Sequence, residues 1–384
     1  MDDDRPFSLQ LLGSLSEIDK ADWDALANPA GQPYHPFVAY DFLEALEASG
    51  SVAPEKGWAP RHAVLSDDDD IIAVAPMYMK GHSQGEYIFD HAWADAYERA
   101  GGNYYPKLLI AIPFTPAPGP RLLARDEAAR EALVTALPSV VEKLGISSLH
   151  MNFMKDTDKE ATSAPWLHRM GQQFHFENDD YASFDDFLQT LASRKRKNLR
   201  KERAAAQGNG LEIIWASGSD ITEDMMEAFW LFYQDTGMRK WGRPYLTRAF
   251  FSMLIERMAD HVLMIMAKRG DTFIAGALNM IGGDTLYGRY WGALEHVPFL
   301  HFEICYYQAI DYAIEHRLKF VEAGAQGEHK IARGYAPKPT FSAHFLPDQN
   351  FSSAVERYLK SERQQVESDI SYLADFTPFK KQPE

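Results

Sequence analysis

Cysteine is almost absent from this chain, whose 384 residues include only Cys305. A single cysteine excludes an internal disulfide, and such usage is typical of proteins kept in a reducing compartment. Cys305 lies in the stretch FEICYYQAI, which we interpret as a buried helix. An inert core thiol is therefore favoured over a reactive nucleophile.

Long apolar runs are also lacking, because the longest ones are interrupted by charged residues. They fall far short of the roughly 20 residues that cross a bilayer, so no membrane span is expected. The opening residues, MDDDRPFSLQ, carry three acids where a secretory signal has a basic segment followed by an apolar one. We therefore expect a cytoplasmic protein.

Several catalytic signatures are missing as well. The sequence contains no motif for a serine nucleophile, no phosphate-cradling Gly-Lys-Ser run and no dinucleotide fingerprint. These absences argue against a covalent enzyme intermediate on serine. No ligand cluster has the spacing of a metal site, so no metal is expected.

The composition that remains is that of a folded protein. Apolar residues make up 46% and aromatic residues 13% of the chain, while the mean hydropathy is only −0.36. The chain therefore has enough apolar residues to form a hydrophobic core, and polar residues are spread between them. Because 384 residues exceed what one hydrophobic core usually holds, two domains are expected.

The two halves of the chain show the same order of predicted elements. In the first half, β-rich runs at 58–66 and 71–80 flank an acidic turn, and a helix at 126–145 and a strand at 146–154 follow. In the second half, strands are predicted at 261–270, 271–283 and 284–292. A helix at 301–318 and an extended segment at 319–324 follow. Two further helices are predicted at about 222–237 and 247–259.

A meander followed by a helix and another strand predicts an α+β fold with a sheet whose later strands are partly parallel. We expect two tandem domains of related architecture, each a mixed sheet flanked by helices, over residues 1–175 and 176–384. The segment of about 349–384 is a candidate to pack back on the first domain.

One segment is strongly basic although the whole chain has a formal charge of −16. Its seven cations are Arg194, Lys195, Arg196, Lys197, Arg200, Lys201 and Arg203. On a helix they cover most of the circumference and leave Leu199 and Asn198 as the inward positions. The run is either a solvated helix end or a binding site for phosphates, and we favour the second because seven cations repel one another.

Several blocks of the sequence closely resemble the FemAB-like family of predicted bacterial N-acyltransferases. They are SRKRKNLRKER, GEYIFDHAWADAYERAGGNYYPKL, PFTPAPGPRLL, RYWGALEHVPFLHFEICYYQAIDYAIEH and EAGAQGEHKIARGYAPKPTFSAHF. They occur in the family's order, and the similarity extends from about Ser8 to Pro347. The resemblance implies a pair of domains of the GNAT (acyl-coenzyme A N-acyltransferase) type. It also implies a relation to Fem transferases, which add amino acids from aminoacyl-tRNA to peptidoglycan precursors.

One segment departs from the pattern of coenzyme A-dependent GNAT enzymes. Those enzymes hold the pyrophosphate on a Gly-rich loop at a helix N-terminus. The corresponding stretch here, ALEHVPFLHFE, has no glycine pair, and Pro298 removes an N–H donor. No cofactor is firmly implied, and acyl-coenzyme A or aminoacyl-tRNA is the expected donor substrate. Aminoacyl-tRNA or another large donor is favoured over acyl-coenzyme A.

The densest supply of groups for N-acyl transfer is the segment EAGAQGEHKIARGY in the second domain. We predict Lys330, Glu328 and His329 as catalytic residues, with the acid or the imidazole as base and the lysine as electrostatic stabiliser. Gln326 and Arg333 are predicted to bind substrate. The alternative is a loop held by its own ion pairs.

A second candidate region lies in the first domain. Asp90 ends a β-rich run and is predicted to bind or deprotonate an acceptor amine, with Trp93 and Tyr104 as pocket aromatics. Arg121 follows a rigid Pro-Gly-Pro bend and is predicted to bind substrate. Aromatic packing with capping aspartates explains this pattern equally well.

These observations predict an N-acyltransferase that transfers an acyl or aminoacyl group to an amine acceptor, such as a cell-wall precursor. The expected partner is phosphate-bearing: tRNA, a nucleotide-sugar precursor, coenzyme A or a carrier protein. The predicted phosphate contacts are Arg194, Lys195, Arg196, Lys197, Arg200 and Lys201. Two alternatives are an acyltransferase that uses acyl-coenzyme A or an acyl carrier protein, and a non-catalytic protein that binds a phosphorylated precursor or RNA.

Overall fold

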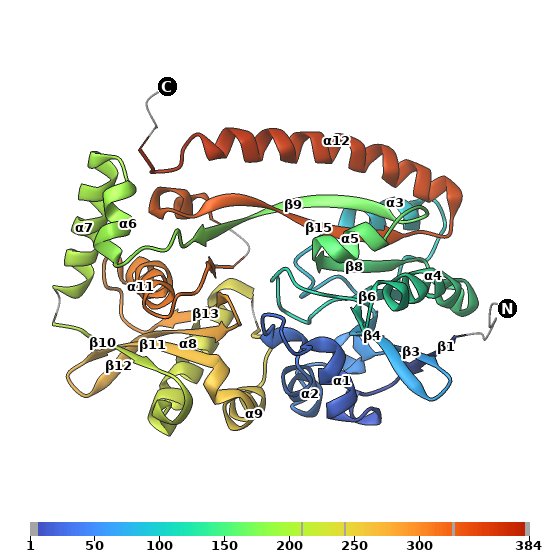
Figure 1. Cartoon of the computed structure of the whole chain (residues 1–384), viewed down its shortest axis with the longest axis horizontal. Coiled ribbons are helices and arrows are strands. Elements are labelled where there is room, and N and C mark those ends of the chain that lie inside the picture. Colours follow the sequence, from blue (N-terminus) through green and yellow to red (C-terminus); the bar gives the residue numbers. More distant parts are fainter. Residues whose placement is uncertain (1–6, 209, 242, 325–326, 381–384) are drawn as a thin grey trace. The chain divides into compact units, whose positions relative to one another are not determined.

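The computed structural model describes residues 7–208, 210–241, 243–324 and 327–380 (Figure 1). The chain folds into two compact units. The first runs to Gly171 and takes in Pro339–Ser368, while the second comprises Gln172–Lys338 and the residues from Asp369 onward. Within the described residues, no helix combines the length and the apolar character needed to cross a membrane.

The first unit contains strands from two sheets. One sheet is antiparallel, in the order β1-β3-β4-β7, with β1 (Ser8–Leu12), β3 (His62–Asp67), β4 (Asp70–Ala75) and β7 (Leu123–Ala124). The other strands are β2 (Trp58–Pro60), β5 (Met77–Lys80), β6 (Lys107–Ile110), β8 (Leu149–Met154) and β15 (Ala336–Phe345). β6 and β8 are parallel, whereas residues 341–345 of β15 pair antiparallel with β8. The predicted acidic hairpin is confirmed by the pairing of Asp67 with Asp70.

Helices of the first unit pack their apolar positions into its core. They are α1 (Lys20–Ala27), α2 (Tyr40–Ala48), α3 (His91–Arg99), α4 (Glu127–Leu144), α5 (Asp156–Ala161) and the part of α12 (Gln349–Ala374) up to Ser368. The predicted helix at 126–145 is α4. It begins where the Asp126 carboxylate caps the Ala129 N–H at 2.8 Å, and it ends at a left-handed Gly145. Leu133 and Leu137 are fully buried, so α4 stabilises this unit by packing against its core.

The second unit is built on a single run of paired strands in the order β10-β11-β12-β13-β14-β9. These are β10 (Glu212–Ala216), β11 (Val262–Arg269), β12 (Thr272–Ile281), β13 (Thr285–Ala293), β14 (Phe320–Glu322) and residues 175–177 of β9 (Leu167–Glu177). β10 to β13 form the predicted antiparallel meander, and β14 joins β13 in parallel. The prediction of partly parallel later strands is therefore confirmed.

The second unit also contains most of the remaining helices. They are α6 (Phe184–Thr190), α7 (Ser193–Gln207), α8 (Glu223–Trp241), α9 (Arg248–Met258), α10 (Leu300–Phe302) and α11 (Gln308–Glu315). A π-helical turn, η6 (Glu303–Tyr307), connects α10 to α11, and a 3₁₀ segment, η7 (Glu328–Arg333), precedes β15. The predicted helices at 222–237 and 247–259 are α8 and α9. The fully buried Phe229, Phe232 and Phe250 show that they contribute to a packed interior.

Each unit contains antiparallel strands, a helix and then a parallel strand, which confirms the α+β fold class and the repeated order of elements. The unit boundaries differ from the predicted ones. The first division falls after Gly171 rather than after residue 175, and the segment 339–368 belongs to the first unit. Residues 341–345 join that unit because they pair with β8 and bury Ala343 and Phe345 in its core. Of the segment 349–384, residues to Ser368 lie with the first unit and those from Asp369 with the second.

Candidate active site

Lys330 is buried near the end of β14 in the second unit. It lies on η7, is 1% exposed, and its Nζ donates to the Gly324 carbonyl oxygen at 2.8 Å. Burial lowers the pKa of Lys330 to about 8, and the nearby Cys305 side chain opposes this only in part. An ammonium group has three donors, and the Gly324 carbonyl is the acceptor found for it among the described residues. The remaining donors can bind an oxygen of a substrate.

Arg333 is the second cation of this segment and is held more firmly. Its guanidinium donates to Glu202 Oε2 at 2.8 Å and to the His329 carbonyl oxygen at 2.7 Å. The guanidinium carbon also lies 3.5 Å from the centre of the Phe302 ring. The next residue, Gly334, has φ of 94°, and a Cβ there would lie 2.7 Å from the Phe187 ring. Only glycine fits at this position, so the end of η7 is fixed by its surroundings.

His329 and Glu328 lie beside Lys330 on the exposed side of η7. The His329 Nε2 is 2.9 Å from the Tyr306 hydroxyl. Burial and the neighbouring Arg333 and Lys330 cations lower the pKa of His329, so the imidazole is neutral at pH 7. A neutral imidazole can accept a proton from a reacting amine. The fifth residue predicted in this segment, Gln326, lies outside the described residues.

The π-helical turn η6 directs the buried side chains of Glu303 and Tyr307 toward α7. Glu303 is fully buried and accepts from Arg203 at 2.9 Å, from Gln207 at 2.8 Å and from Gln308 at 2.7 Å. Arg203 also donates to Asp311 at 2.6 Å. The last cation of the basic run is therefore an anchor that attaches α7 to the core. Single π-helical turns inside helices are common at functional sites.

Four cations of the basic run, Arg194, Lys197, Arg200 and Lys201, are exposed on the outer surface of α7, while Lys195 and Arg196 are half-buried. Leu199 is buried as predicted, whereas Asn198 is exposed, so the prediction of Asn198 as an inward position is wrong. Arg196 donates to Gln189 and Arg200 to Asp185. Among the described residues, no ion pair is found for Arg194, Lys195, Lys197 and Lys201. The structure thus separates one structural arginine from a set of cations that remain available to an anion.

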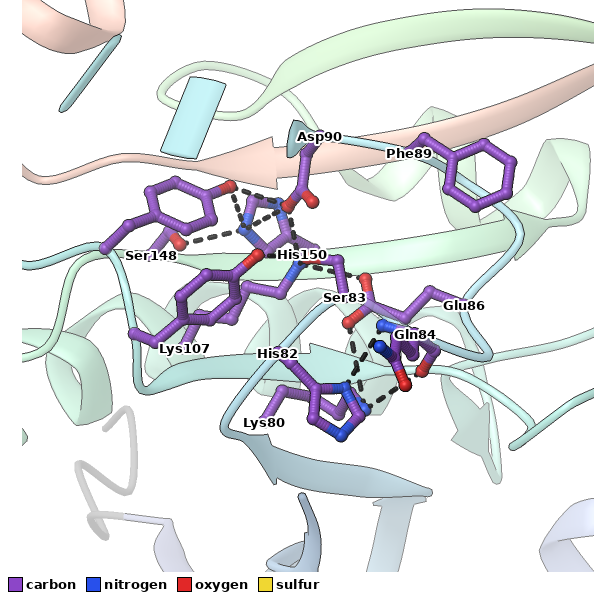
Figure 2. Close-up of polar contacts among 12 residues, drawn as sticks. Lys80, His82, Ser83, Gln84, Glu86, Phe89, Asp90, Lys107, Ser148 and His150 are labelled. Atoms are coloured by element: carbon purple, nitrogen blue, oxygen red, sulfur yellow. Dashed lines mark hydrogen bonds and ion pairs between the residues drawn. The ribbon is translucent and has the colours of Figure 1, made fainter. Parts of the chain in front are cut away.

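A second set of titratable side chains is buried in the first unit, where it forms what we call the Lys107 network (Figure 2). Its members are Lys80, Ser83, Glu86, Asp90, Tyr104, Lys107, His150 and His344. Lys107, on β6, is fully buried and donates to Asp90 Oδ2 at 2.5 Å, Glu86 Oε2 at 2.9 Å and Ser83 Oγ at 2.8 Å. Figure 2 shows Asp90 and Lys107 pointing toward each other while Phe89 points away from them.

Asp90 precedes α3 and connects the lysine to a pair of histidines. Tyr104 donates to Asp90 Oδ2 at 2.7 Å, and the His150 and His344 Nδ1 atoms are 2.7 Å apart. Burial disfavours the carboxylate, but the Lys107 ammonium outweighs it and holds the pKa of Asp90 well below its usual range. Burial lowers the pKa of His150 to about 3, so this imidazole is neutral. Asp90 is therefore paired with Lys107, and its predicted role toward an acceptor amine stays a prediction.

Lys80 and Glu86 occupy the other end of the network. The Lys80 ammonium lies 3.5 Å from the centre of the Trp58 ring and 4.0 Å from Glu86 Oε1. Burial lowers the pKa of Lys80 to about 7 and raises the pKa of Glu86 to about 7. Sequence reasoning missed Lys80, Glu86, Lys107, His150 and His344. Lysines at strand ends look solvent-exposed in a sequence, and only pairing in the fold buries them.

The predicted residues of the first unit fall into two places. Trp93 packs edge-on against His344 at 4.9 Å between ring centres, so it joins Asp90 and Tyr104 around the Lys107 network. Arg121 lies apart from them. It is fully buried and donates to the carbonyl oxygens of Ala117 at 2.7 Å and Asn152 at 2.8 Å. These contacts brace the loop that contains Arg121, and its predicted role in substrate binding stays a prediction.

Comparison with known proteins identifies the family. The model of the FemAB-like family, described as peptidoglycan biosynthesis/recognition, matches residues 14–381. No curated protein matches the chain.

The solved structures that resemble the chain share its fold at low identity. A FemX structure has a TM-score of 0.54 at 13% identity and covers 88% of this chain and 98% of its own. The C-terminal domain of a putative lysylphosphatidylglycerol synthetase from Agrobacterium fabrum has a TM-score of 0.54 at 10% identity, covering 89% and 96%. The structure of L-PGS from Bacillus licheniformis has a TM-score of 0.50 at 9% identity, covering 86% and 98%. The family match over nearly the whole sequence, together with this fold, shows that the chain belongs to the FemAB-like family.

Proposed function

We propose that the chain is an N-acyltransferase that moves an acyl or aminoacyl group from an activated donor to an amine, with Lys330 as the oxyanion stabiliser. The observation that carries the proposal is the environment of Lys330. This ammonium is buried, has one carbonyl acceptor among the described residues, and has no carboxylate within ion-pair distance there. A buried cation of this kind is ready to stabilise a negative charge that develops during a reaction.

The proposed chemistry is direct transfer. The neutral acceptor amine attacks the donor carbonyl, and a C–N bond forms while the carbonyl oxygen becomes an oxyanion. The Lys330 ammonium binds that oxygen, and at pH 7 a pKa of about 8 keeps the lysine roughly nine-tenths protonated. The bond from carbon to the leaving oxygen or sulfur then breaks. The leaving group takes up the proton that the nitrogen loses, so charge and atoms balance without an enzyme-bound intermediate.

We propose His329 as the relay for that proton. It is neutral at pH 7, adjoins Lys330 in the sequence and is hydrogen-bonded to Tyr306. The hydroxyl can orient the ring and hold its tautomer. Glu328 is exposed beside it and remains a predicted second base.

A phosphate-bearing donor fits the outer surface of α7, and we propose aminoacyl-tRNA as that donor. Arg194, Lys197 and Lys201 are exposed there, whereas Arg203 forms ion pairs with the buried Glu303 and the half-buried Asp311. At the start of α10, Phe299 has a left-handed backbone and follows Pro298. This is not the Gly-rich turn that would hold a coenzyme pyrophosphate. Acyl-coenzyme A and an acyl carrier protein are the competing donors.

The test is a transfer assay with labelled donors. Total aminoacyl-tRNA, acetyl-coenzyme A and an acyl carrier protein would each be incubated with the protein and a panel of amine acceptors, including a uridine-diphosphate-linked peptidoglycan precursor. We expect label transfer from aminoacyl-tRNA, and loss of that transfer in Lys330→Gln. The exposed Lys319→Gln is the matched control. Transfer from acetyl-coenzyme A alone would contradict aminoacyl-tRNA as the donor. Full activity of Lys330→Gln would show that Lys330 has no part in the mechanism.

A further inference from the structure

A cavity of about 430 Å³ lies in the first unit, and none of the residues proposed to act in catalysis lines it. Its walls come from α5, the start of β9, β15 and α12. The lining residues that matter here are Lys159, Trp166, His168, Phe341, Leu359 and Arg363. The volume is within the range of small-molecule sites in proteins.

The apolar part of the cavity is firmly packed. Trp166 is 6% exposed and its ring centre lies 6.1 Å from that of Phe345. Leu359 is fully buried, and Phe341 is half-buried. A wall of this kind is already in place before binding, so it suits an apolar group of a ligand.

Two cations on the walls, Lys159 and Arg363, have no carboxylate partner among the described residues. The Lys159 ammonium lies 3.9 Å from the centre of the Phe341 ring, and Arg363 donates to the carbonyl oxygen of His168. By contrast, the neighbouring Arg169 donates to both carboxylate oxygens of Glu362, at 2.7 and 2.8 Å. Because half-buried cations gain from a counter-ion, Lys159 and Arg363 favour an anionic group in the cavity.

The charge balance of the rim limits that anion to a small charge. Glu356 and Glu367, both exposed on α12, also line the cavity. Their two negative charges offset the two cations, so a phosphate dianion or a diphosphate gains little net attraction. A single carboxylate that reaches the half-buried cations is the better match.

His168 adds a hydrogen-bond acceptor beside these cations. Its Nε2 is 2.9 Å from Thr162 Oγ1, and that hydroxyl is itself within 3.0 Å of the carbonyl oxygens of Asp158 and Lys159. In the tautomer in which Nε2–H donates to Thr162 Oγ1 and the hydroxyl donates to a carbonyl, Nδ1 is an acceptor. Burial and the nearby cations keep the ring neutral by lowering its pKa. An N–H group on the ligand would satisfy Nδ1.

We infer that this cavity binds an N-acylated amino acid or the corresponding end of an acylated peptide. The carboxylate pairs with Lys159 and Arg363, the amide N–H donates to His168, and the acyl chain lies on Trp166, Phe341 and Leu359. This inference goes beyond the proposed transferase reaction and does not depend on it, because binding is measured without turnover.

Isothermal titration of the full chain with N-decanoylglycine tests the inference. The comparison ligands are its methyl ester, which lacks the charge, and decanoate, which lacks the amide. All three are used below their micelle concentrations. On the wild-type chain we expect N-decanoylglycine to bind at least tenfold more tightly than either comparison ligand. Absence of binding, or equal binding of the ester, would overturn the site. Equal binding of decanoate would overturn the assignment to N-acylated amino acids.

Variants check the same site from the protein side. The double variant Lys159→Gln, Arg363→Gln is expected to weaken N-decanoylglycine binding at least tenfold, whereas Lys155→Gln, an exposed lysine that does not line the cavity, leaves it unchanged. Equal loss in both would show that general charge attraction is responsible and would contradict the proposal. The ligand comparison on the wild-type chain stays decisive even if the double variant folds poorly.

Discussion

The two candidate regions each contain a buried lysine, and the two lysines have opposite electrostatic environments. Lys107 donates to two carboxylates and a hydroxyl, and those partners outweigh burial and raise its pKa. Lys330 donates to one carbonyl, and burial lowers its pKa to about 8. A buried cation with its charge fully neutralised holds a fold together. A buried cation without a carboxylate partner is suited to binding an anion that forms during a reaction.

The largest effect expected from this comparison is on stability. Lys107→Met should lower the free energy of unfolding by about 3–5 kcal/mol, because Asp90 and Glu86 would be left as buried carboxylates without their cation. Lys80→Met should cost less than half of this, since the Lys80 ammonium is 4.0 Å from Glu86, faces the Trp58 ring and donates one hydrogen bond, to the Gln84 carbonyl oxygen. Urea unfolding would measure both. Equal losses would mean that the short ion pairs of Lys107 are not what stabilises the unit.

The next effect is on catalysis without a matching effect on stability. Lys330→Gln should reduce the rate of acyl transfer by about 10²–10³-fold, the loss typical of removing one oxyanion donor. The melting temperature should change little, because the lysine satisfies only one carbonyl in the described structure. A melting temperature that fell as far as that of Lys107→Met would erase the difference between the two lysines.

A pH profile sharpens the comparison further. Lys330 acts as an ammonium, so the rate should fall as the pH rises through about 8, where its proton is lost. Lys330→Arg keeps the charge at higher pH and should move this alkaline limb upward. An alkaline limb that is unchanged in Lys330→Arg would show that another group causes it.

The lowered pKa of Lys330 also affects stability. Because the pKa in the folded chain lies below the usual 10.5, unfolding takes up a proton between these two values, and the free energy of unfolding rises with pH across that window.

The smallest effect concerns the outer cations of α7. Replacing Arg194, Lys197 and Lys201 with Gln should flatten the salt dependence of tRNA binding, by a slope of roughly 0.7–0.9 for each phosphate that the variant no longer neutralises. Arg203→Gln should instead lower the melting temperature, because Glu303 would remain buried without its cation. Filter binding at several salt concentrations measures the slopes. The same slope in the triple variant as in the wild-type chain would leave the basic run as a solvated helix face.

Local sequence patterns predict much of the fold. The strands from Trp58 to Lys80, the helix α4 and the meander from Val262 to Ala293 follow from alternation, caps and turn residues that lie close together in the sequence. Chain order places the segment 339–368 in the second domain, and only its part from about residue 349 is predicted as a candidate to pack back on the first domain. Its membership of the first unit depends on pairing of β15 with β8, and such a long-range contact has no local signal.

The residues of the candidate sites also differ in whether the sequence predicts them. Lys330, His329 and Arg333 are predictable because they are neighbours in one polar, glycine-flanked segment. Asp90, Trp93 and Tyr104 are predicted for a pocket, and the structure brings them together around a lysine that the sequence does not single out. The histidine pair combines His150 and His344, which are 194 positions apart, so no spacing rule could reveal it.

The sequence by itself determined many of the helices and strands, the family and the presence of seven closely spaced cations. These properties depend on residues that are near one another in the chain, or on the order of whole blocks. The tertiary structure decided which charges are neutralised. Within the described residues Arg203 and Lys107 are paired with carboxylates and Lys330 is not, because the energy of a charge depends on burial and on partners that distant segments supply.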